Sequence, residues 1–281
     1  MTVSQAPARP TPAATTTRPA PKPNTKPAAP TPAAPKTFTV STGPKKKGQR
    51  IVLYGTGGVG KTTLASLAGS VRFIDIDSAG TAAMDVQRVE GIASFDDVIA
   101  ALREESLWKG VDTIVVDSAT KLEEWAKEWT IANITTDKGA AVKSIEGYGW
   151  GKGYSHLYDT FMLFLAAVDR HVEQGRNVIL ICHQVVDKVP NPAGDDYSQH
   201  QPALQKSNQG NIRSRVQGWC DHMLFVGYDV AAKDGKGIGS GTRTIQVVEL
   251  PAYQAKSRTL RDPIDYPEGS DEVWRAMGIK Q

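Results

Sequence analysis

The sequence lacks the features that mark secreted, zinc-binding and membrane-spanning proteins. It has only two cysteines, Cys182 and Cys220, with no CxxC pair and no histidine pair at metal-binding spacing. Both fit buried free thiols, which favours a reducing compartment over a disulfide framework. No apolar run approaches the roughly 20 residues that a helix needs to cross a bilayer. We therefore expect a cytoplasmic protein that makes no membrane contact.

The first 50 residues lack acidic side chains and hold one aromatic residue, Phe38. They contain nine of the 33 Lys and Arg residues, and eleven of the 17 prolines lie between Pro7 and Pro44. Such a segment cannot bury enough apolar surface to offset its ordering entropy. We expect residues 1–47 to form a disordered tail with polyproline II character, a tether rather than a DNA-binding arm or a secretory signal. The rest of the chain is net acidic, so the overall basic charge does not indicate a basic binding face.

From residue 48 onward, short apolar strands alternate with segments of helical periodicity. Strands are expected at 50–55, 71–77, 111–118 and 176–184, and helices at 61–70, 94–106, 119–133 and 154–175. This alternation predicts an α/β domain with a mostly parallel sheet flanked by helices. Two later strands, 221–230 and 242–250, flank a Gly-rich segment and predict an antiparallel edge hairpin near the C-terminus. We place the domain at 48–268 and a C-terminal tail at 269–281.

A glycine-rich loop joins the first strand to the first helix. It fits G-x-x-x-x-G-K-[ST] completely, with the strand before it and the helix after it. Its backbone N–H groups can turn toward one anion, Lys61 can reach the β and γ phosphates, and the Thr62 hydroxyl can bind Mg²⁺. Partition-type ATPases carry a similar loop with an extra lysine, but Thr56 stands at that position. We expect ATP and Mg²⁺ as ligands, held by Gly55, Thr56, Gly57, Gly58, Val59, Gly60, Lys61, Thr62 and, continuing the helix, Thr63.

Acidic and polar side chains end three of the predicted strands. Asp117 ends TIVVD, where its carboxylate could hold the Mg²⁺ water shell; capping the next helix is the alternative. Asp77 ends FIDID at the same edge of the sheet and could reach the attacking water, whereas Asp75 could cap or pair locally. His183 and Gln184 end LICHQ, a polar pair that could sense the γ phosphate. A satisfied strand-end histidine is the alternative for His183.

These motifs, in this order, resemble the core of RecA-type P-loop ATPases. FIDID resembles the RecA strand end FIDAE, whose glutamate activates water, and Asp77 takes that place with a side chain one methylene shorter. LICHQ resembles FINQ, whose glutamine couples the γ-phosphate state to the DNA-binding loop that follows; Gln184 matches it. The motifs cover roughly residues 50–261, and the overall match is to phage ATPases of the AAA-domain group that includes Sak-type single-strand annealing proteins. The resemblance implies a RecA-like fold and, if a phage encodes the chain, a bacterial host cell.

Near the C-terminus, AYQAKSRTL resembles the K-x-R element of hexameric RecA-like helicases, whose Lys and Arg reach the neighbouring subunit's nucleotide. Lys256 and Arg258 match these positions. A guanidinium supplied in trans stabilises charge on the transferring phosphoryl group. We therefore expect ATP-dependent homo-oligomers, with an exposed basic loop as the plain alternative. Arg213 and Arg215 are the other candidates for the trans arginine.

Two stretches are candidates for contact with single-stranded DNA. The second stretch, 200–215, overlaps a long polar segment, 185–211, that follows Gln184 and that we expect to be a functional or mobile loop. In the first stretch, 135–155, lysines alternate with aromatic residues that could stack on unpaired bases. The alternative is that the aromatic rings pack beneath the loop and the lysines are solvated. The candidate residues are Lys143, Tyr148, Trp150, Lys152 and Tyr154 in the first stretch and Lys206, Arg213 and Arg215 in the second.

The favoured function is an ATP-hydrolysing enzyme that acts on single-stranded DNA in phage-type recombination or replication, through annealing. A helicase or helicase loader fits the K-x-R element equally well and would have to displace a strand. An alternative from another class is a nucleotide-switched adaptor that docks a protein through its Pro-rich tail and contacts no DNA. A small-molecule phosphotransferase is less favoured, because no second substrate pocket is legible.

Overall fold

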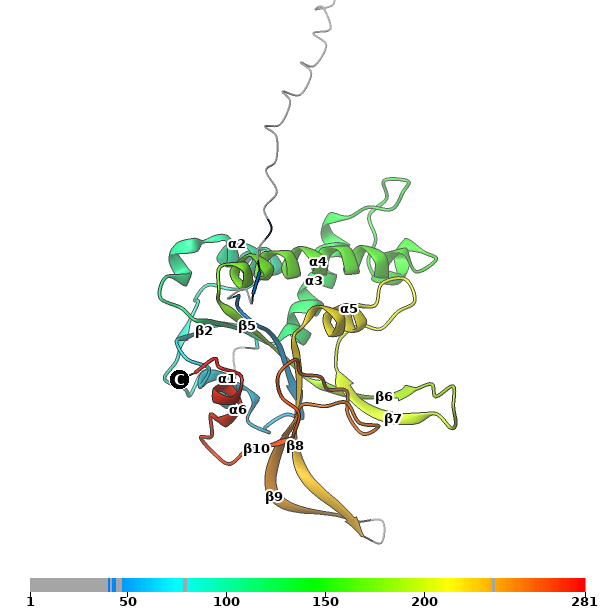
Figure 1. The fold of residues 1–281 in the computed structure, drawn as a ribbon. Coiled ribbons are helices and arrows are strands. Elements are labelled where there is room, and N and C mark those ends of the chain that lie inside the picture. The colour runs from blue at the N-terminus through cyan, green and yellow to red at the C-terminus, as the bar shows by residue number, and fades with distance from the viewer. Residues whose placement is uncertain (1–39, 41, 44–46, 78–79, 234–235, 281) are drawn as a thin grey trace, which may run out of the picture. The chain divides into compact units, whose positions relative to one another are not determined.

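The computed structural model describes residues 40, 42–43, 47–77, 80–233 and 236–280 (Figure 1). They belong to one compact unit, Lys45–Gln281, apart from the first three. The predicted disordered tail, 1–47, lies outside the described residues except at 40, 42–43 and 47. In the part of the chain that is described, no helix is long and apolar enough to span a membrane.

Within the described residues, an eight-stranded sheet has the order β10-β9-β8-β1-β5-β4-β2-β3. Neighbouring strands from β8 to β3 are parallel, whereas β9 and β10 run antiparallel at the C-terminal edge. The predicted fold class is therefore confirmed. The strands are β1 (Arg50–Gly55), β2 (Val71–Asp75), β3 (Gln87–Arg88), β4 (Thr113–Asp117), β5 (Asn177–Cys182), β8 (His222–Lys233), β9 (Lys236–Gln246) and β10 (Ile264–Asp265).

Helices cover both faces of this sheet (Figure 1). One face carries α2, α3, α4 and α5, and the other carries α1 and α6. The described helices are α1 (Lys61–Ser66), α2 (Phe95–Arg103), α3 (Ala119–Asn133), α4 (Lys152–Glu173), α5 (Ile212–Trp219) and α6 (Glu272–Ala276), with 3₁₀ turns η1 (Glu105–Trp108) and η2 (Ile145–Tyr148).

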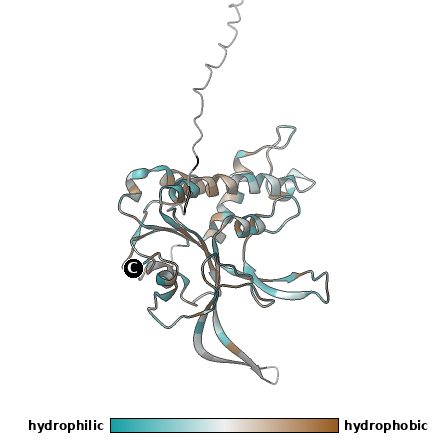
Figure 2. Cartoon of the chain, in the orientation of Figure 1, coloured by the Kyte–Doolittle hydropathy of each residue, from teal (hydrophilic) through white to brown (hydrophobic). Residues whose placement is uncertain are grey.

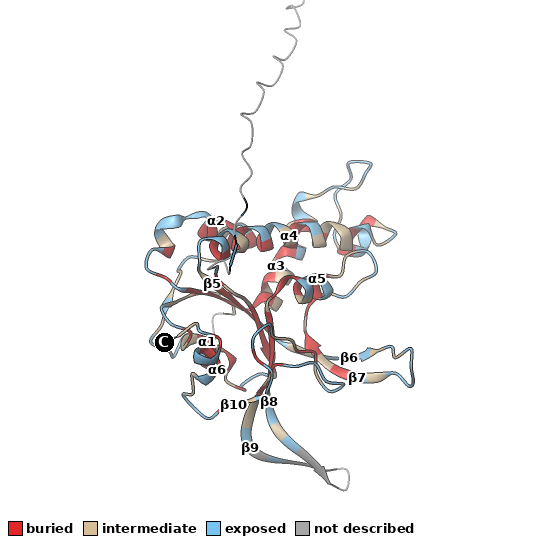
Figure 3. Ribbon diagram, viewed as in Figure 1, coloured by how far each residue is buried: buried red, intermediate tan, exposed pale blue. Residues whose placement is uncertain are grey.

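The parallel strands are apolar on both sides because each side faces a helix layer (Figure 2). Along β1, Val52 and Tyr54 face the core under α2 to α5, while Ile51 and Leu53 face the core around α1 and α6. All four side chains are fully buried, and the middle of the sheet is the most buried part of the unit (Figure 3). The β1 backbone, and hence the loop that follows it, is held from both faces.

Two serines define where the helices on the larger face begin. The Ser94 hydroxyl accepts the Asp97 N–H at 3.2 Å, as the capping pattern in the sequence predicts. The Ser118 hydroxyl accepts the Lys121 N–H at 3.2 Å and starts α3 directly after β4. Because Ser118 caps α3, the carboxylate of the preceding Asp117 is not needed for that cap.

The segment 185–211, expected as a loop, contains regular structure. Its first part forms an antiparallel hairpin of β6 (Gln184–Val189) and β7 (Tyr197–Pro202), separate from the main sheet. The hairpin is largely polar (Figure 2), so hydrophobic periodicity gives little signal for it. The expected loop is thus corrected to a hairpin, whose register pairs Gln184 with Pro202.

The C-terminal region also differs from expectation. Residues 269–281 were predicted to form a tail, but α6 packs on the core and Trp274 is fully buried. The Trp274 indole N–H donates to the Leu64 carbonyl of α1 at 2.7 Å. A short helix fixed by one large side chain has too little periodicity to be found from sequence. The expected edge hairpin exists, but β8 and β9 continue through the Gly-rich segment that was expected to join them.

Candidate functional site

The glycine-rich loop leaves β1 at Gly55 and enters α1 at Lys61, as predicted. The Lys61 ammonium donates to the carbonyls of Gly55 at 3.0 Å and Thr56 at 2.8 Å, so the side chain arches over the loop. Burial lowers the pKa of Lys61, and the negative charge of Asp117 opposes this effect. A partly desolvated cation over a ring of backbone amides is suited to bind an oligophosphate.

Asp117 lies beside the loop at the end of β4. The Thr62 hydroxyl donates to its Oδ2 at 2.7 Å. Burial raises the pKa of Asp117, the Thr62 hydrogen bond opposes this, and the neighbouring charges of Asp75 and Asp77 add to it. Only 5 % of Asp117 is exposed, and the charge of Lys61 offsets only part of the cost of burying the carboxylate.

Mg²⁺ fits the donor set formed by the Thr62 hydroxyl and the Asp117 carboxylate. Mg²⁺ prefers oxygen ligands and is commonly held by one or two protein groups together with substrate phosphates. In the described residues, no group of three or more His, Cys, Asp and Glu side chains could hold a metal without phosphates. The pair is therefore matched to a metal that arrives with a nucleotide.

The two aspartates of FIDID have different surroundings. Asp75, paired in register with Asp117, accepts hydrogen bonds from the backbone and hydroxyl of Thr81. Asp77 lies further along and its Oδ2 is 3.4 Å from His183 Nε2. The Asp77 and His183 side chains are 28 % and 53 % exposed, so solvent water reaches both. Of these two carboxylates, Asp77 is the one placed to meet a water molecule.

Gln184 begins β6 immediately after His183, and the hairpin connects it to α5 through buried polar contacts. On β6, Asp187 accepts a hydrogen bond from Arg213 of α5 at 2.8 Å. Arg213 also donates to Gln201 at 2.7 Å and twice to the Leu204 carbonyl. The β6 backbone joins Gln184 to Asp187, and this polar path continues from Asp187 to α5.

Glu123 of α3 contacts the segment between β7 and α5. Its carboxylate accepts the Gln205 N–H at 3.1 and 2.9 Å. Burial raises its pKa to about 7, against the lowering effects of the Gln205 hydrogen bond and Arg213. Sequence reasoning missed Glu123, because a carboxylate on an amphipathic helix gives no sign that a distant loop covers it.

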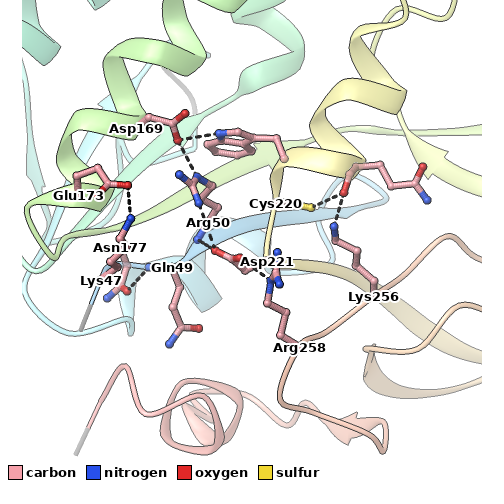
Figure 4. Close-up of polar contacts among 12 residues, drawn as sticks. Lys47, Gln49, Arg50, Asp169, Glu173, Asn177, Cys220, Asp221, Lys256 and Arg258 are labelled. Atoms are coloured by element: carbon pink, nitrogen blue, oxygen red, sulfur yellow. Dashed lines mark hydrogen bonds and ion pairs between the residues drawn. The ribbon is translucent and has the colours of Figure 1, made fainter. Parts of the chain in front are cut away.

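Lys256 and Arg258 lie near Asp221 and Arg50, at the amino end of β1 (Figure 4). Arg258 Nε is 2.7 Å from Oδ1 of Asp221, which also accepts the Arg50 backbone N–H at 3.0 Å. Lys256 donates to the Gln217 carbonyl. Arg50 and Gly55 are the two ends of β1, so the length of that strand, roughly 17 Å, separates this cluster from the phosphate loop.

The predicted DNA-binding residues divide into buried and exposed groups. Tyr148 is buried, and its hydroxyl donates to the carbonyls of Thr130 and Ile134, both at 2.8 Å. Arg213 is buried in the polar path described above. The structure argues against both assignments, because the polar groups of each side chain are already bonded within the chain. It also makes Arg213 unsuitable as a trans arginine.

Trp150 is the opposite case, with 92 % of its surface exposed. Its φ of 51° lies in the left-handed region, between Gly149 and Gly151 at 72° each. A non-glycine residue there is uncommon and carries a modest backbone cost. Three successive residues with positive φ precede α4 and leave the indole in solvent.

The two predicted DNA-binding stretches lie side by side. The Ser155 hydroxyl of α4 donates to the Gln209 carbonyl at 2.6 Å, and Gly151 abuts the Gln209 side chain. A groove of about 490 Å³ runs between α4 and the start of α5, and Arg215 lines it. The other candidates have mixed environments. Lys143 and Lys206 are exposed, Lys206 and Lys152 pair with Asp187 and Asp137, and the Tyr154 hydroxyl donates to Glu146.

The fold and the loop geometry together define a P-loop nucleotide-binding domain. A family model described as an AAA domain, AAA_24, matches residues 47–259, and the chain belongs to this family. Among solved structures, a KaiC-like protein from the hyperthermophilic archaeon Pyrococcus horikoshii OT3 is similar over 80% of this chain and 88% of that chain. The two share 13% sequence identity at a TM-score of 0.42. No curated protein matches this chain.

Proposed function

We propose that this chain is a Mg²⁺-dependent ATPase that assembles with ATP and acts on single-stranded DNA, as expected for phage-type recombination or replication by annealing. The observation that carries the ATPase is the contact of the Thr62 hydroxyl with Asp117 at 2.7 Å, beneath Lys61. The three side chains come from the loop and from β4, two strands away in the sheet. Their convergence is what a nucleoside triphosphate with its metal requires.

Each residue of the site has a distinct role in this proposal. Lys61 leaves the loop carbonyls to contact the β and γ phosphates, while the loop amides hold the remaining oxygens. Thr62 and Asp117 hold Mg²⁺, which neutralises phosphate charge when bound. Asp77 orients the attacking water and accepts its proton, and His183 holds the Asp77 carboxylate in place.

The position of Arg258 supports assembly. An arginine at the amino ends of the strands cannot reach the nucleotide of its own chain, which lies beyond the other end of β1. It can reach a nucleotide only on a neighbouring copy. Its side chain is 68 % exposed, and a surface ion pair such as that with Asp221 costs little to exchange.

The groove between α4 and α5 supports the DNA contact. Arg215 lines the groove together with Asp159 and offers a cation, and Trp150, exposed at the turn just before α4, offers a flat apolar face outside the groove lining. A cation and an exposed aromatic ring are the two components that bind the phosphates and bases of a single strand. The polar path from Gln184 through Arg213 ends at the helix that carries Arg215. Loss of the γ phosphate could thereby change the groove, so that ATP holds a DNA-competent state and hydrolysis releases it.

The test is the steady-state ATPase rate at low salt, with and without single-stranded DNA, beside Lys61→Ala. We expect a rate that rises with DNA and is lost in the variant. A DNA-independent rate would instead favour the protein adaptor, and deletion of residues 1–47 would then show whether the tail drives docking. Displacement of an annealed strand at the expense of ATP would favour the motor.

A further inference from the structure

A hollow adjoins the phosphate loop on the side of β9 and β10. Thr63, the residue after the loop motif, lines a space of about 310 Å³ together with Arg243, Tyr266 and Glu268. A second space of about 550 Å³ shares the last three residues and continues toward Asp229 and Asp265. Thr63 directly follows the residues that would hold the phosphates, so the hollow begins one residue beyond the loop motif. The hollow is therefore in reach of the nucleoside.

The walls of this hollow also contact the loop itself. Tyr266 donates its hydroxyl to the Gly60 carbonyl at 3.0 Å, and Arg243 Nη1 donates to the Val59 carbonyl at 3.1 Å. Gly60 has a φ of 97°, and an added Cβ would lie 2.7 Å from Arg243 Nη1. Only glycine permits this approach. Arg243 and Tyr266 thus hold the loop carbonyls outward, which leaves the loop N–H groups free for an anion.

The chemistry of the walls fits a purine. The Arg243 guanidinium lies over the Tyr266 ring at 4.4 Å, and a delocalised cation stacked on an aromatic ring is a flat platform for a base. Glu268 is exposed at the rim, where its carboxylate can accept hydrogen bonds. An exocyclic amino group is a donor that such an acceptor recognises. The platform gives affinity, and the carboxylate gives preference for an amino-bearing base.

We propose that the hollow formed by Thr63, Arg243, Tyr266 and Glu268 binds the nucleoside of the triphosphate, with an aminopurine stacked on Arg243 and its amino group toward Glu268. The inference rests on the proposed function, since it takes the phosphates to occupy the loop. It assigns nucleotide specificity to β9 and to the turn after β10, which lie outside the glycine-rich motif. Binding of the base and bracing of the loop then depend on the same two side chains.

The experiment compares binding of ATP and of inorganic tripolyphosphate, each with Mg²⁺, to the full chain by calorimetry. Arg243→Ala is expected to weaken ATP about tenfold, the loss of one stacked base, and tripolyphosphate by less than about threefold. Arg275→Ala removes an exposed arginine of α6 that does not line the hollow, and should leave both unchanged. An equal loss of both ligands in Arg243→Ala would show that Arg243 only braces the loop, and would overturn the nucleoside site.

A second variant avoids any effect on folding. Glu268 is exposed and its loss removes no packing, so Glu268→Ala should reduce the preference for ATP over inosine triphosphate about threefold to tenfold. An unchanged preference would overturn the role of the carboxylate. If the wild-type chain binds neither ATP nor tripolyphosphate, the proposed function fails together with the inference. If it binds both equally tightly, the phosphate site stands and only the nucleoside site is lost.

Discussion

The two ends of the parallel strands carry charged clusters of different kinds. At the carboxyl ends, Lys61 and Asp117 are nearly buried. Burial lowers the pKa of Lys61 and raises the pKa of Asp117, so it favours the neutral form of each. At the amino ends, Arg258 pairs with Asp221 on the surface and keeps most of its area in solvent. Burying the charges of the first cluster costs free energy, whereas the exposed arginine of the second cluster carries little such cost.

This difference shows which cluster is built for a ligand within the chain. A carboxylate and an ammonium stay buried only where the rest of the fold is stable enough to offset the cost. Here two layers of helices pack on both sides of β1 and β4. The surface cluster has no such support and is free to change partners. The comparison therefore favours nucleotide binding at the carboxyl ends, and the proposed function gives the amino ends the contact with another copy.

The largest expected effect is on the ATPase rate when Arg258, at the amino ends of the strands, is removed. Arg258→Ala should lower the ATPase rate about 10³-fold or more, because a trans arginine contributes at least that much, while ATP affinity stays unchanged. The measurement is the rate at assembling concentrations beside equilibrium nucleotide binding. Arg261→Ala, an exposed arginine three residues away, is the control and should have little effect.

A mixture of variants sharpens the same comparison. The Lys61→Ala variant keeps Arg258 but lacks the lysine that would contact the phosphates. The Arg258→Ala variant keeps the phosphate site but lacks the arginine. Mixed oligomers should recover part of the activity that neither variant has alone, because each supplies what the other lacks. Absence of recovery, with both variants shown to co-assemble, would place the role of Arg258 within its own chain.

The second prediction concerns the buried cluster at the carboxyl ends of the strands. Asp117→Asn should lower the ATPase rate about 10²-fold or more through loss of the metal ligand. It should also raise the thermal midpoint at pH values where Asp117 is ionised, because burial raises the pKa of Asp117 and the ionised form therefore destabilises the folded state. Thermal unfolding without nucleotide tests this; a lower midpoint would mean that the Thr62 contact outweighs the cost of burying the charge. Asp262→Asn, at an exposed aspartate, is the matched control.

The third prediction concerns the groove between α4 and α5. Trp150→Ala should weaken binding of single-stranded DNA about fivefold to a hundredfold, the loss of one stacked base, with little change in ATP binding. Fluorescence anisotropy with a labelled oligonucleotide measures it. Leu163→Ala, which truncates an exposed apolar side chain further along α4, should bind as the wild type does. Equal affinities for the two variants would remove Trp150 from the interface.

The smallest expected effect is on stability. The pKa of Glu123 is raised to about 7, so between about pH 4.5 and pH 7 the unfolded chain has released a proton that the folded chain keeps. The unfolding free energy therefore falls as pH rises through this window. Glu123→Gln should make the unfolding free energy less dependent on pH and raise it by about 1–2 kcal/mol at pH 8. The gain is limited because the glutamine amide must also find a hydrogen-bond partner. Urea unfolding at pH 5 and pH 8 measures it, and an unchanged pH slope would contradict it.

Sequence reasoning located the elements that carry strong local patterns. The glycine-rich loop, Asp117 at the end of an apolar strand and the Ser94 cap all depend on contiguous residues, and all are in the predicted places. It failed where the pattern is short or polar, as in the β6–β7 hairpin and α6. There, pairing with distant segments outweighs the weak local preference.

Side-chain roles were harder to predict than elements. Tyr148 and Trp150 are two residues apart in one Gly-rich stretch, yet one is buried with its hydroxyl bonded and the other is almost wholly exposed. Similarly, Arg213 is buried and Arg215 exposed on the same helix. Composition cannot separate such neighbours, because burial depends on which distant segment packs over each of them.

By itself, the sequence determined the phosphate loop, the alternation of strands and helices, and the acidic residues at the strand ends, since each follows from neighbouring residues. Only the tertiary structure decided that Thr62 meets Asp117, that His183 lies beside Asp77, and that Arg243 and Tyr266 brace the loop. These contacts join residues between 55 and 206 positions apart. Their existence depends on strand order and on packing across the sheet, and neither of these is written in any local pattern.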